Sequence, residues 1–173
     1  MAYIRRDIES KVTALSTEYA CILITGPRQV GKTTMLRKLM GESRHYVTLD
    51  DLEARRLAKS DPALFLQMHD TPILIDEVQY APELFSYIKI AIDNGAVPGS
   101  FWLTGSQAFR MMELAQESLA GRTAILHMSG LSQHEIYGSG DNEPFSVGFD
   151  SLKRRKACGA PANLEEIYER IWQ

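Results

Sequence analysis

Short apolar runs alternate with amphipathic stretches along most of the chain. The apolar runs predict five strands, at residues 21–25, 45–49, 73–75, 101–104 and 124–128. The amphipathic stretches predict helices at residues 5–17, 33–40, 52–59, 62–68, 82–94 and 107–120. Strands without a polar face, separated by helices, are typical of a parallel sheet that is covered on both faces. We therefore expect residues 1–137 to form an α/β domain with three layers, α/β/α, and a five-stranded parallel sheet.

The rest of the chain has a different composition. Residues 138–163 are rich in Gly, Ser, Pro and Asp and predict a linker. Their basic run, Lys153 to Lys156, could contact nucleic acid or acidic lipid, although a short run between polar residues is more often solvated. Residues 164–173 predict the start of a further helix or of a truncated second domain, because one helical face carries Leu164, Ile167, Tyr168 and Ile171.

A glycine-rich loop joins the first predicted strand to the helix that follows it. Its residues are Gly26, Pro27, Arg28, Gln29, Val30, Gly31, Lys32 and Thr33, with Thr34 directly after them. The glycines let successive backbone N–H groups turn toward phosphate, and the helix start adds its positive dipole end. Lys32 suits the β- and γ-phosphates, and the Thr33 hydroxyl suits magnesium. The loop therefore predicts a nucleoside triphosphate site, in which Arg28 either contacts the nucleotide or a partner or, more commonly, is solvated.

Two carboxylates follow the third predicted strand. Asp76 stands at the carboxyl end of this apolar strand, where it would lie beside the phosphate loop and could hold magnesium through water. Glu77 comes next and is placed to take a proton from a water molecule aligned on the γ-phosphate. A surface Asp-Glu pair is the simpler alternative, and the phosphate loop makes it the weaker one.

The fourth predicted strand ends in the polar residues Thr104 and Ser106. In phosphate-loop ATPases of the additional-strand class, a polar residue at this place orients the attacking water or contacts the γ-phosphate. Thr104 and Ser106 are both candidates for that role. Ser106 is the weaker candidate because serine is also a good N-cap for the next helix.

Arg122 lies between the helix predicted at 107–120 and the fifth strand, just after Gly121, which is expected to end that helix. In ring-forming ATPases, an arginine at this junction reaches the γ-phosphate of a neighbouring subunit, and it raises the rate by neutralising charge during transfer. The alternative is that Arg122 pairs with a helix C-terminal carbonyl or a local carboxylate. The residues alone leave the two roles equally weighted.

Composition narrows the remaining functions only slightly. The 173 residues, 45% hydrophobic and 24% charged, suffice for one ordinary core. A net charge of −3 argues against a protein that binds nucleic acid over its whole surface, although a local basic patch could still bind it. Cys21 and Cys158 form neither a disulfide framework nor a metal motif, which favours a reducing cytoplasm. No apolar run approaches the length of a membrane span, so we expect no membrane partner.

Over about residues 5–137 the chain resembles the predicted AAA-type ATPases of bacteria and archaea, within the AAA+ superfamily. The resemblance rests on the phosphate loop and on further runs in the same order, which are Thr48–Asp51, Asp61-Pro62, Ile75–Gln79, Pro82–Phe85, Leu103–Gln107 and Ser118–Arg122. It implies ATP as the nucleotide, the sheet order of the additional-strand class and a second, C-terminal domain of unknown function. Gly130 stands where members usually have a proline, and Gln173 falls where the second domain would begin, so we expect a truncated version.

Three functions fit these predictions. We favour an ATPase that hydrolyses ATP with magnesium to rearrange a partner or an attached domain, for which Glu77→Gln should abolish turnover and spare binding. One alternative is a nucleotide-dependent switch or scaffold with little turnover. The other is a small-molecule kinase, for which the sequence offers neither an acceptor pocket nor an Arg-rich lid. The sequence identifies neither a protein client nor the size of an oligomer.

Overall fold

The computed structural model describes residues 3–106, 113, 118–137 and 147–158. Residues 3–131 form one compact unit, and residues 132–173 belong to a second. The first unit carries the sheet and every predicted site residue.

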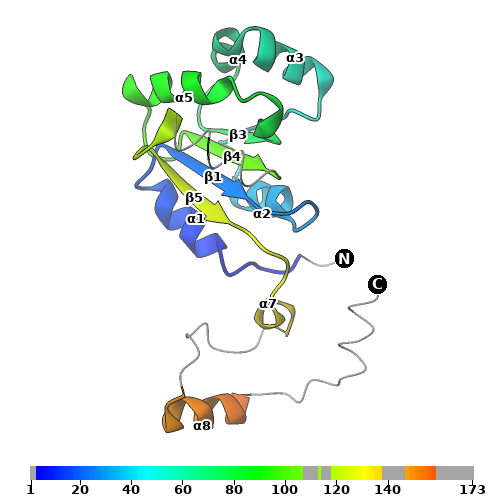
Figure 1. The fold of residues 1–173 in the computed structure, drawn as a ribbon, viewed down its shortest axis with the longest axis vertical. Helices are drawn as coiled ribbons and strands as arrows, with labels where there is room; N and C mark the ends of the chain where they lie inside the picture. Colours follow the sequence, from blue (N-terminus) through cyan, green and yellow to red (C-terminus); the bar gives the residue numbers. More distant parts are fainter. Residues whose placement is uncertain (1–2, 107–112, 114–117, 138–146, 159–173) are drawn as a thin grey trace. The chain divides into compact units, whose positions relative to one another are not determined.

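The described residues of the first unit form one parallel sheet (Figure 1). Its strands are β1 (Cys21–Thr25), β2 (His45–Thr48), β3 (Ile73–Asp76), β4 (Phe101–Gly105) and β5 (Thr123–His127). The order is β2-β3-β4-β1-β5, so β4 lies between β1 and β3. This confirms the predicted α/β class and the additional-strand order, and each strand begins and ends within one residue of its predicted bounds.

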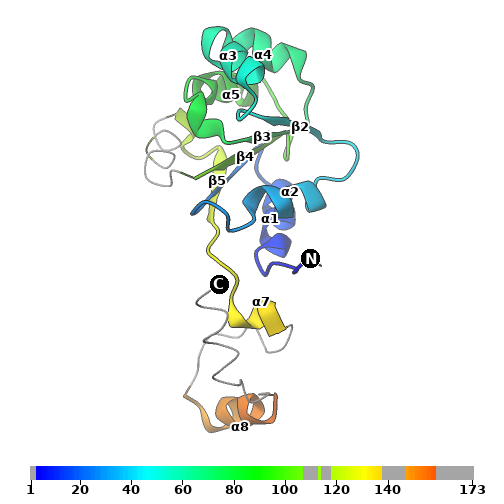
Figure 2. The same cartoon turned by 90° about the vertical axis from the view of Figure 1, so that its right-hand side faces the viewer.

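Helices cover both faces of this sheet and give the predicted three layers (Figure 2). The helices on one face are α1 (Glu9–Ser16) and α2 (Lys32–Leu39). Those on the other face are α3 (Leu52–Ser60), α4 (Pro62–Met68) and α5 (Leu84–Asp93). Successive strand side chains point to opposite faces, so Ile22 packs with α1 and α2 whereas Leu23 packs with α3, α4 and α5. Both cores are apolar, as a doubly covered sheet requires.

The first helix is shorter than its prediction of residues 5–17. Arg6 stays outside it because its guanidinium reaches carbonyl groups elsewhere in the unit, and its backbone N–H donates to the Glu9 carboxylate at 2.7 Å. Helix α1 therefore starts at Glu9. Helix α5 likewise starts two residues later than predicted, after turns at Ala81 and Pro82.

The second unit corrects one local expectation. Helix α8 (Phe149–Cys158) lies inside the segment of residues 138–163 that was predicted as a linker. The segment was predicted as a linker from its polar composition. Charged residues nevertheless form helices well when the helix is largely exposed to water. A short helix, α7 (Gln133–Tyr137), precedes it. Most of the helix predicted at 107–120 and all of the segment 164–173, predicted to start a further helix, fall outside the described residues.

Parallel strands bring their carboxyl ends to one edge of the sheet. At this edge β1 ends at Thr25, β3 at Asp76 and β4 at Gly105, and β3 and β1 are both direct neighbours of β4. A ligand site is expected at such an edge, outside the carboxyl ends of neighbouring strands. The loops that follow these three strands carry nearly all of the predicted site residues.

Candidate functional site

The phosphate loop connects β1 to α2 in a conformation that needs its glycines. Gly26 has φ +150°, and a side-chain Cβ there would lie 2.1 Å from the backbone oxygen of Met128, just after β5. Gly31 has φ +91° and is the residue from which α2 begins. Gln29 between them also has a positive φ, 64°. The first glycine is thus required by the close approach of a neighbouring chain segment as well as by the turn.

The middle of the loop faces outward. Pro27, Arg28 and Gln29 are exposed, Val30 is half-buried, and Thr34 is exposed on the first turn of α2. Arg28 is thus exposed, and this position is compatible with contact to a nucleotide, to a partner or to solvent alone. Gly26 and Lys32 lie inside, so the loop has a buried base and an open rim.

Lys32 points its ammonium group back into the loop. The Nζ atom donates to the carbonyl oxygens of Gly26 at 2.9 Å and Pro27 at 2.7 Å. Burial lowers the pKa of Lys32, and the nearby carboxylates of Glu77 and Asp76 oppose that shift. The Lys32 ammonium group is therefore held at the centre of the loop. The carboxylates that attract it, Asp76 and Glu77, lie at the carboxyl end of β3.

Asp76 is the point on which three hydroxyl groups converge. Thr33 Oγ1 donates to Asp76, lying 2.9 Å from Oδ1 and 3.0 Å from Oδ2. Thr104 Oγ1 donates to Oδ1, and Tyr46 Oη donates to Oδ2 at 3.2 Å. Because the donors come from α2, β4 and β2, the buried carboxylate is fixed from three elements at once.

Glu77 follows Asp76 in the left-handed conformation, with φ 56°. Its side chain accepts a hydrogen bond from Gln79 Nε2, and the same amide nitrogen lies 3.3 Å from Ser106 Oγ. Non-glycine residues rarely adopt this backbone conformation, which costs about 1–3 kcal/mol and is concentrated at functional sites. The turn directs the Glu77 carboxylate toward the end of β4, where Ser106 lies.

Arg122 lies at the opposite edge of the sheet. It precedes Thr123, which pairs with Cys21, the first residue of β1, whereas the phosphate loop follows the last residue. The guanidinium Nε donates to Asp93 at 2.5 Å, and another of its nitrogens donates to the Ala120 carbonyl at 3.2 Å. Arg122 therefore makes the local contacts that were one of its two expected roles. The length of β1, about 16 Å, separates it from the phosphate loop of its own chain.

The AAA domain family matches residues 18–137 of this chain. The chain belongs to the AAA family. It is therefore a nucleotide-binding ATPase domain in the general sense, as the phosphate loop predicts.

Two relatives of this AAA domain are uncharacterized proteins of Mycobacterium bovis and Mycobacterium tuberculosis. Each is 38% identical over 138 residues, an alignment that covers 78% of this chain and 31% of the relative. The chain thus spans about a third of the length of these relatives. Among solved structures, the Walker-type ATPase PABY2304 of Pyrococcus abyssi is similar, with a TM-score of 0.56 and 17% identity over 92% of this chain and 60% of that one. At that identity the likeness supports the fold.

Three residues of the AAA domain's site carry contacts that sequence reasoning did not assign. They are Arg6, Tyr46 and Gln79. Arg6 donates from its guanidinium to the carbonyls of Val30 and Ser129, both at 2.7 Å, and so joins the phosphate loop to the segment after β5. Only Gln79 had a signal in the sequence, because it lies two residues after Glu77 in a run that resembles the family.

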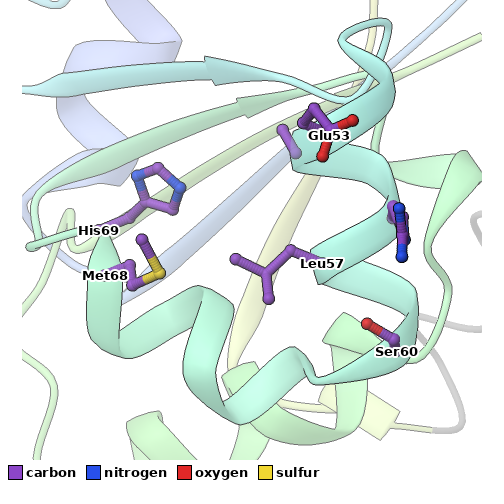
Figure 3. A pocket seen from close by; sticks show the side chains of 7 residues that line it. Glu53, Leu57, Ser60, Met68 and His69 are labelled. Atoms are coloured by element: carbon purple, nitrogen blue, oxygen red, sulfur yellow. The ribbon is translucent and has the colours of Figure 1, made fainter.

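A separate pocket of about 460 Å³ lies between α3 and α4 (Figure 3). Its lining includes Leu57, Met68 and His69, with Glu53 and Ser60 at its side. None of the predicted nucleotide-site residues lines it. Within the part of the chain that the structure describes, no helix is both long enough and apolar enough to cross a membrane.

Proposed function

We propose that this AAA domain binds ATP with magnesium and hydrolyses it. The observation that carries the proposal is the convergence of Thr33, Thr104 and Asp76 beside Lys32 at one edge of the sheet. These side chains come from the phosphate loop helix and from two strand ends, and their hydroxyl, carboxylate and ammonium groups match the needs of a bound triphosphate.

The donor atoms at this edge fit magnesium. Thr33 supplies a hydroxyl and Asp76 a carboxylate, with their oxygens 2.9 Å apart, and hard oxygen ligands of this kind are what Mg²⁺ prefers. The described residues contain no group of three or more His, Cys, Asp or Glu side chains able to hold a metal. Thr33 and Asp76 would therefore share the ion with phosphate oxygens, whose developing negative charge it would neutralise.

Hydrolysis assigns a task to each remaining residue. Backbone N–H groups of the loop and the start of α2 bind the phosphate oxygens, and the Lys32 ammonium neutralises the β- and γ-phosphates. The Glu77 carboxylate takes a proton from water as the water oxygen bonds to the γ-phosphorus. The bond from that phosphorus to the β–γ bridging oxygen breaks, and ADP leaves with the electron pair. Thr104 and Ser106 orient the attacking water or contact the γ-phosphate.

We further propose that turnover rearranges a partner or an attached domain. This chain spans 31% of the length of its mycobacterial relatives, so such a domain has room in proteins of that size. Assembly in a ring belongs to the same proposal, because Arg122 lies at the amino end of the strands and would reach a phosphate loop in a second copy. The charge of −3 gives no support to nucleic acid as the client.

The test is phosphate release from Mg·ATP at increasing protein concentration, with Glu77→Gln as the control. We expect specific activity to rise with concentration and the variant to bind ATP without releasing phosphate. Release that stays at the level of the variant at every concentration would contradict hydrolysis and favour a nucleotide switch. Phosphate that appears only with an added acceptor would favour a kinase.

A further inference from the structure

Gln79 connects two residues that the proposed reaction needs at the same moment. Its Nε2 donates to the Glu77 carboxylate and lies 3.3 Å from Ser106 Oγ. Its Oε1 accepts from the Ser106 backbone N–H at 3.3 Å. One side-chain amide therefore joins the end of β3 to the end of β4 through both of its polar atoms.

The amide acts from a fixed base. Gln79 is only 7% exposed and belongs to a one-turn 3₁₀ helix, η1 (Val78–Tyr80). Val78 on one side of it is fully buried in the core under α3, α4 and α5. Tyr80 on the other side packs against the Arg55 guanidinium, 3.9 Å from the ring centroid. With both neighbours held, the Gln79 side chain has little freedom to take its hydrogen bonds elsewhere.

The bonding pattern also suits the chemistry. A carboxylate has two oxygens, and the bond from Gln79 engages Oε2 of Glu77, so that the lone pairs of Oε1 remain available to accept a proton. Catalytic bases are commonly oriented in this way by a third group that holds their other end. Ser106 is one of the two candidates for contact with the γ-phosphate, so the same amide sets the base relative to the group being transferred.

We propose that Gln79 is a positioning residue that holds the Glu77 carboxylate in register with Ser106 for attack on the γ-phosphate. The proposal rests on the proposed ATP hydrolysis and adds the means by which its base is aligned. Misplacing a reacting group by about 1 Å can lower the rate about 100-fold, so the loss of an aligning hydrogen bond should lower kcat strongly.

Two variants of nearly unchanged size test the role. Gln79→Met removes both hydrogen-bonding atoms, and Gln79→Glu keeps the acceptor for Ser106 while losing the donor to Glu77. Gln67→Met, on the exposed side of α4, is the matched control. For each protein, thermal unfolding, the ATP dissociation constant and the kcat and KM of phosphate release are measured.

We expect kcat to fall at least tenfold in both Gln79 variants, with the ATP dissociation constant within about threefold of the wild-type value and the control unchanged. In the Glu77→Gln background, where no phosphate release is expected, Gln79→Met should leave the ATP dissociation constant unchanged. Combined with Ser106→Ala, its effect should be less than additive, because the two residues act as one unit.

Wild-type kcat in a folded Gln79→Met variant would overturn the proposal, as would equal losses of ATP binding and of kcat. A wild-type chain that releases no more phosphate than Glu77→Gln would instead overturn the proposed hydrolysis, and the role of Gln79 would fall with it. The first result leaves hydrolysis standing and the second does not, so the two failures are distinct.

Discussion

Thr33 and Asp76 are 43 residues apart in the sequence, and the hydroxyl of one lies 2.9 Å from the carboxylate of the other. The contact crosses from the first turn of α2 to the last residue of β3. The insertion of β4 between β1 and β3 sets the spacing at which the loop after β1 can face the end of β3. The fold therefore brings together the two side chains proposed to share one magnesium ion.

Thr33→Ala should remove the magnesium-dependent part of ATP affinity. The variant lacks the hydroxyl that faces Asp76, so we expect ATP binding to weaken at least tenfold in Mg²⁺, which is about 1.4 kcal/mol, and to stay unchanged in EDTA. Thr33→Ser keeps the hydroxyl and serves as the control, with affinity close to that of the wild type. Titration of a fluorescent ATP analogue measures both. An equal loss in Mg²⁺ and in EDTA would point to a damaged loop instead of a lost ligand.

Gly26→Ala should destabilise the fold far more than Gly31→Ala does. At Gly26 the new Cβ would lie 2.1 Å from a backbone oxygen, whereas at Gly31 the nearest atoms are 3.9 Å away. We expect Gly31→Ala to lower the free energy of unfolding by about 1–2 kcal/mol through backbone strain alone. Gly26→Ala should cost about 4 kcal/mol or more, in the range of severe core changes.

Gly95→Ala is the matched control for this series. Gly95 has φ +97°, close to the value at Gly31, and a Cβ added there would meet no atom within 4 Å. Urea unfolding of the three variants therefore separates strain from steric clash. Equal losses at Gly26 and Gly95 would refute the role of the close approach to Met128.

Arg122→Ala tests the assignment of this residue to a neighbouring subunit. If Arg122 acts in trans, phosphate release should fall at least tenfold in the variant, because the arginine no longer neutralises charge at transfer. A mixture of Arg122→Ala with Glu77→Gln should regain part of the activity, since each protein supplies what the other lacks. Two inactive proteins that stay inactive when mixed would argue against a shared site.

Asp93→Ala separates this role from the local ion pair. The side chains of Arg122 and Asp93 are 37% and 41% exposed, and a surface pair of this kind contributes at most about 1 kcal/mol to stability. We expect Asp93→Ala to keep wild-type turnover, because it frees the arginine without removing it. If the two variants lose activity equally, the pair itself is what matters.

His69 should make the fold less stable in acid. Burial lowers the pKa of His69, and nearby His45 lowers it further. The unfolded chain therefore binds a proton at a higher pH than the folded chain does. The contribution of neutral His69 to the free energy of unfolding is fully present above the ordinary histidine pKa of about 6.5. It is lost as the pH falls from that value through the lower pKa of the folded state. The urea midpoint should drop between pH 8 and pH 5.5, and His69→Gln should reduce that drop. An identical drop in the variant would contradict the prediction.

The strands show how much of the fold the sequence predicts. The central strands β1, β3 and β4 are short apolar runs that are buried throughout, as the sequence pattern predicts. The outer strands β2 and β5 are only partly buried, and their residues are more mixed. The helices were predicted less well at their ends. Helix α1 starts at Glu9 because Arg6 is bonded to Val30 and Ser129, residues far from it in the sequence. Helix α8 was missed because its polar residues carry no apolar period strong enough to distinguish it from a linker.

The site residues likewise fall into those that the sequence predicts and those that it does not. Phosphate binding requires glycines, a lysine and a threonine at fixed spacings within one loop, so Lys32 and Thr33 could be selected from the sequence. Asp76 and Glu77 could be selected because they follow a buried strand. Tyr46 could not, since its hydroxyl meets Asp76 only through the pairing of β2 with β3.

The sequence by itself determined that this chain is an α/β domain with a phosphate loop. Both the spacing of apolar residues and the residues of the loop lie within short, continuous stretches of the chain. Only the tertiary structure decided which carboxylate oxygen faces which hydroxyl, that Gln79 joins Glu77 to Ser106, and that Arg122 lies at the far edge of the sheet. Those relationships depend on strand order and on the direction of side chains that are distant along the chain. A local sequence pattern determines neither the strand order nor these side-chain directions, because the packing of the whole sheet decides which strands pair.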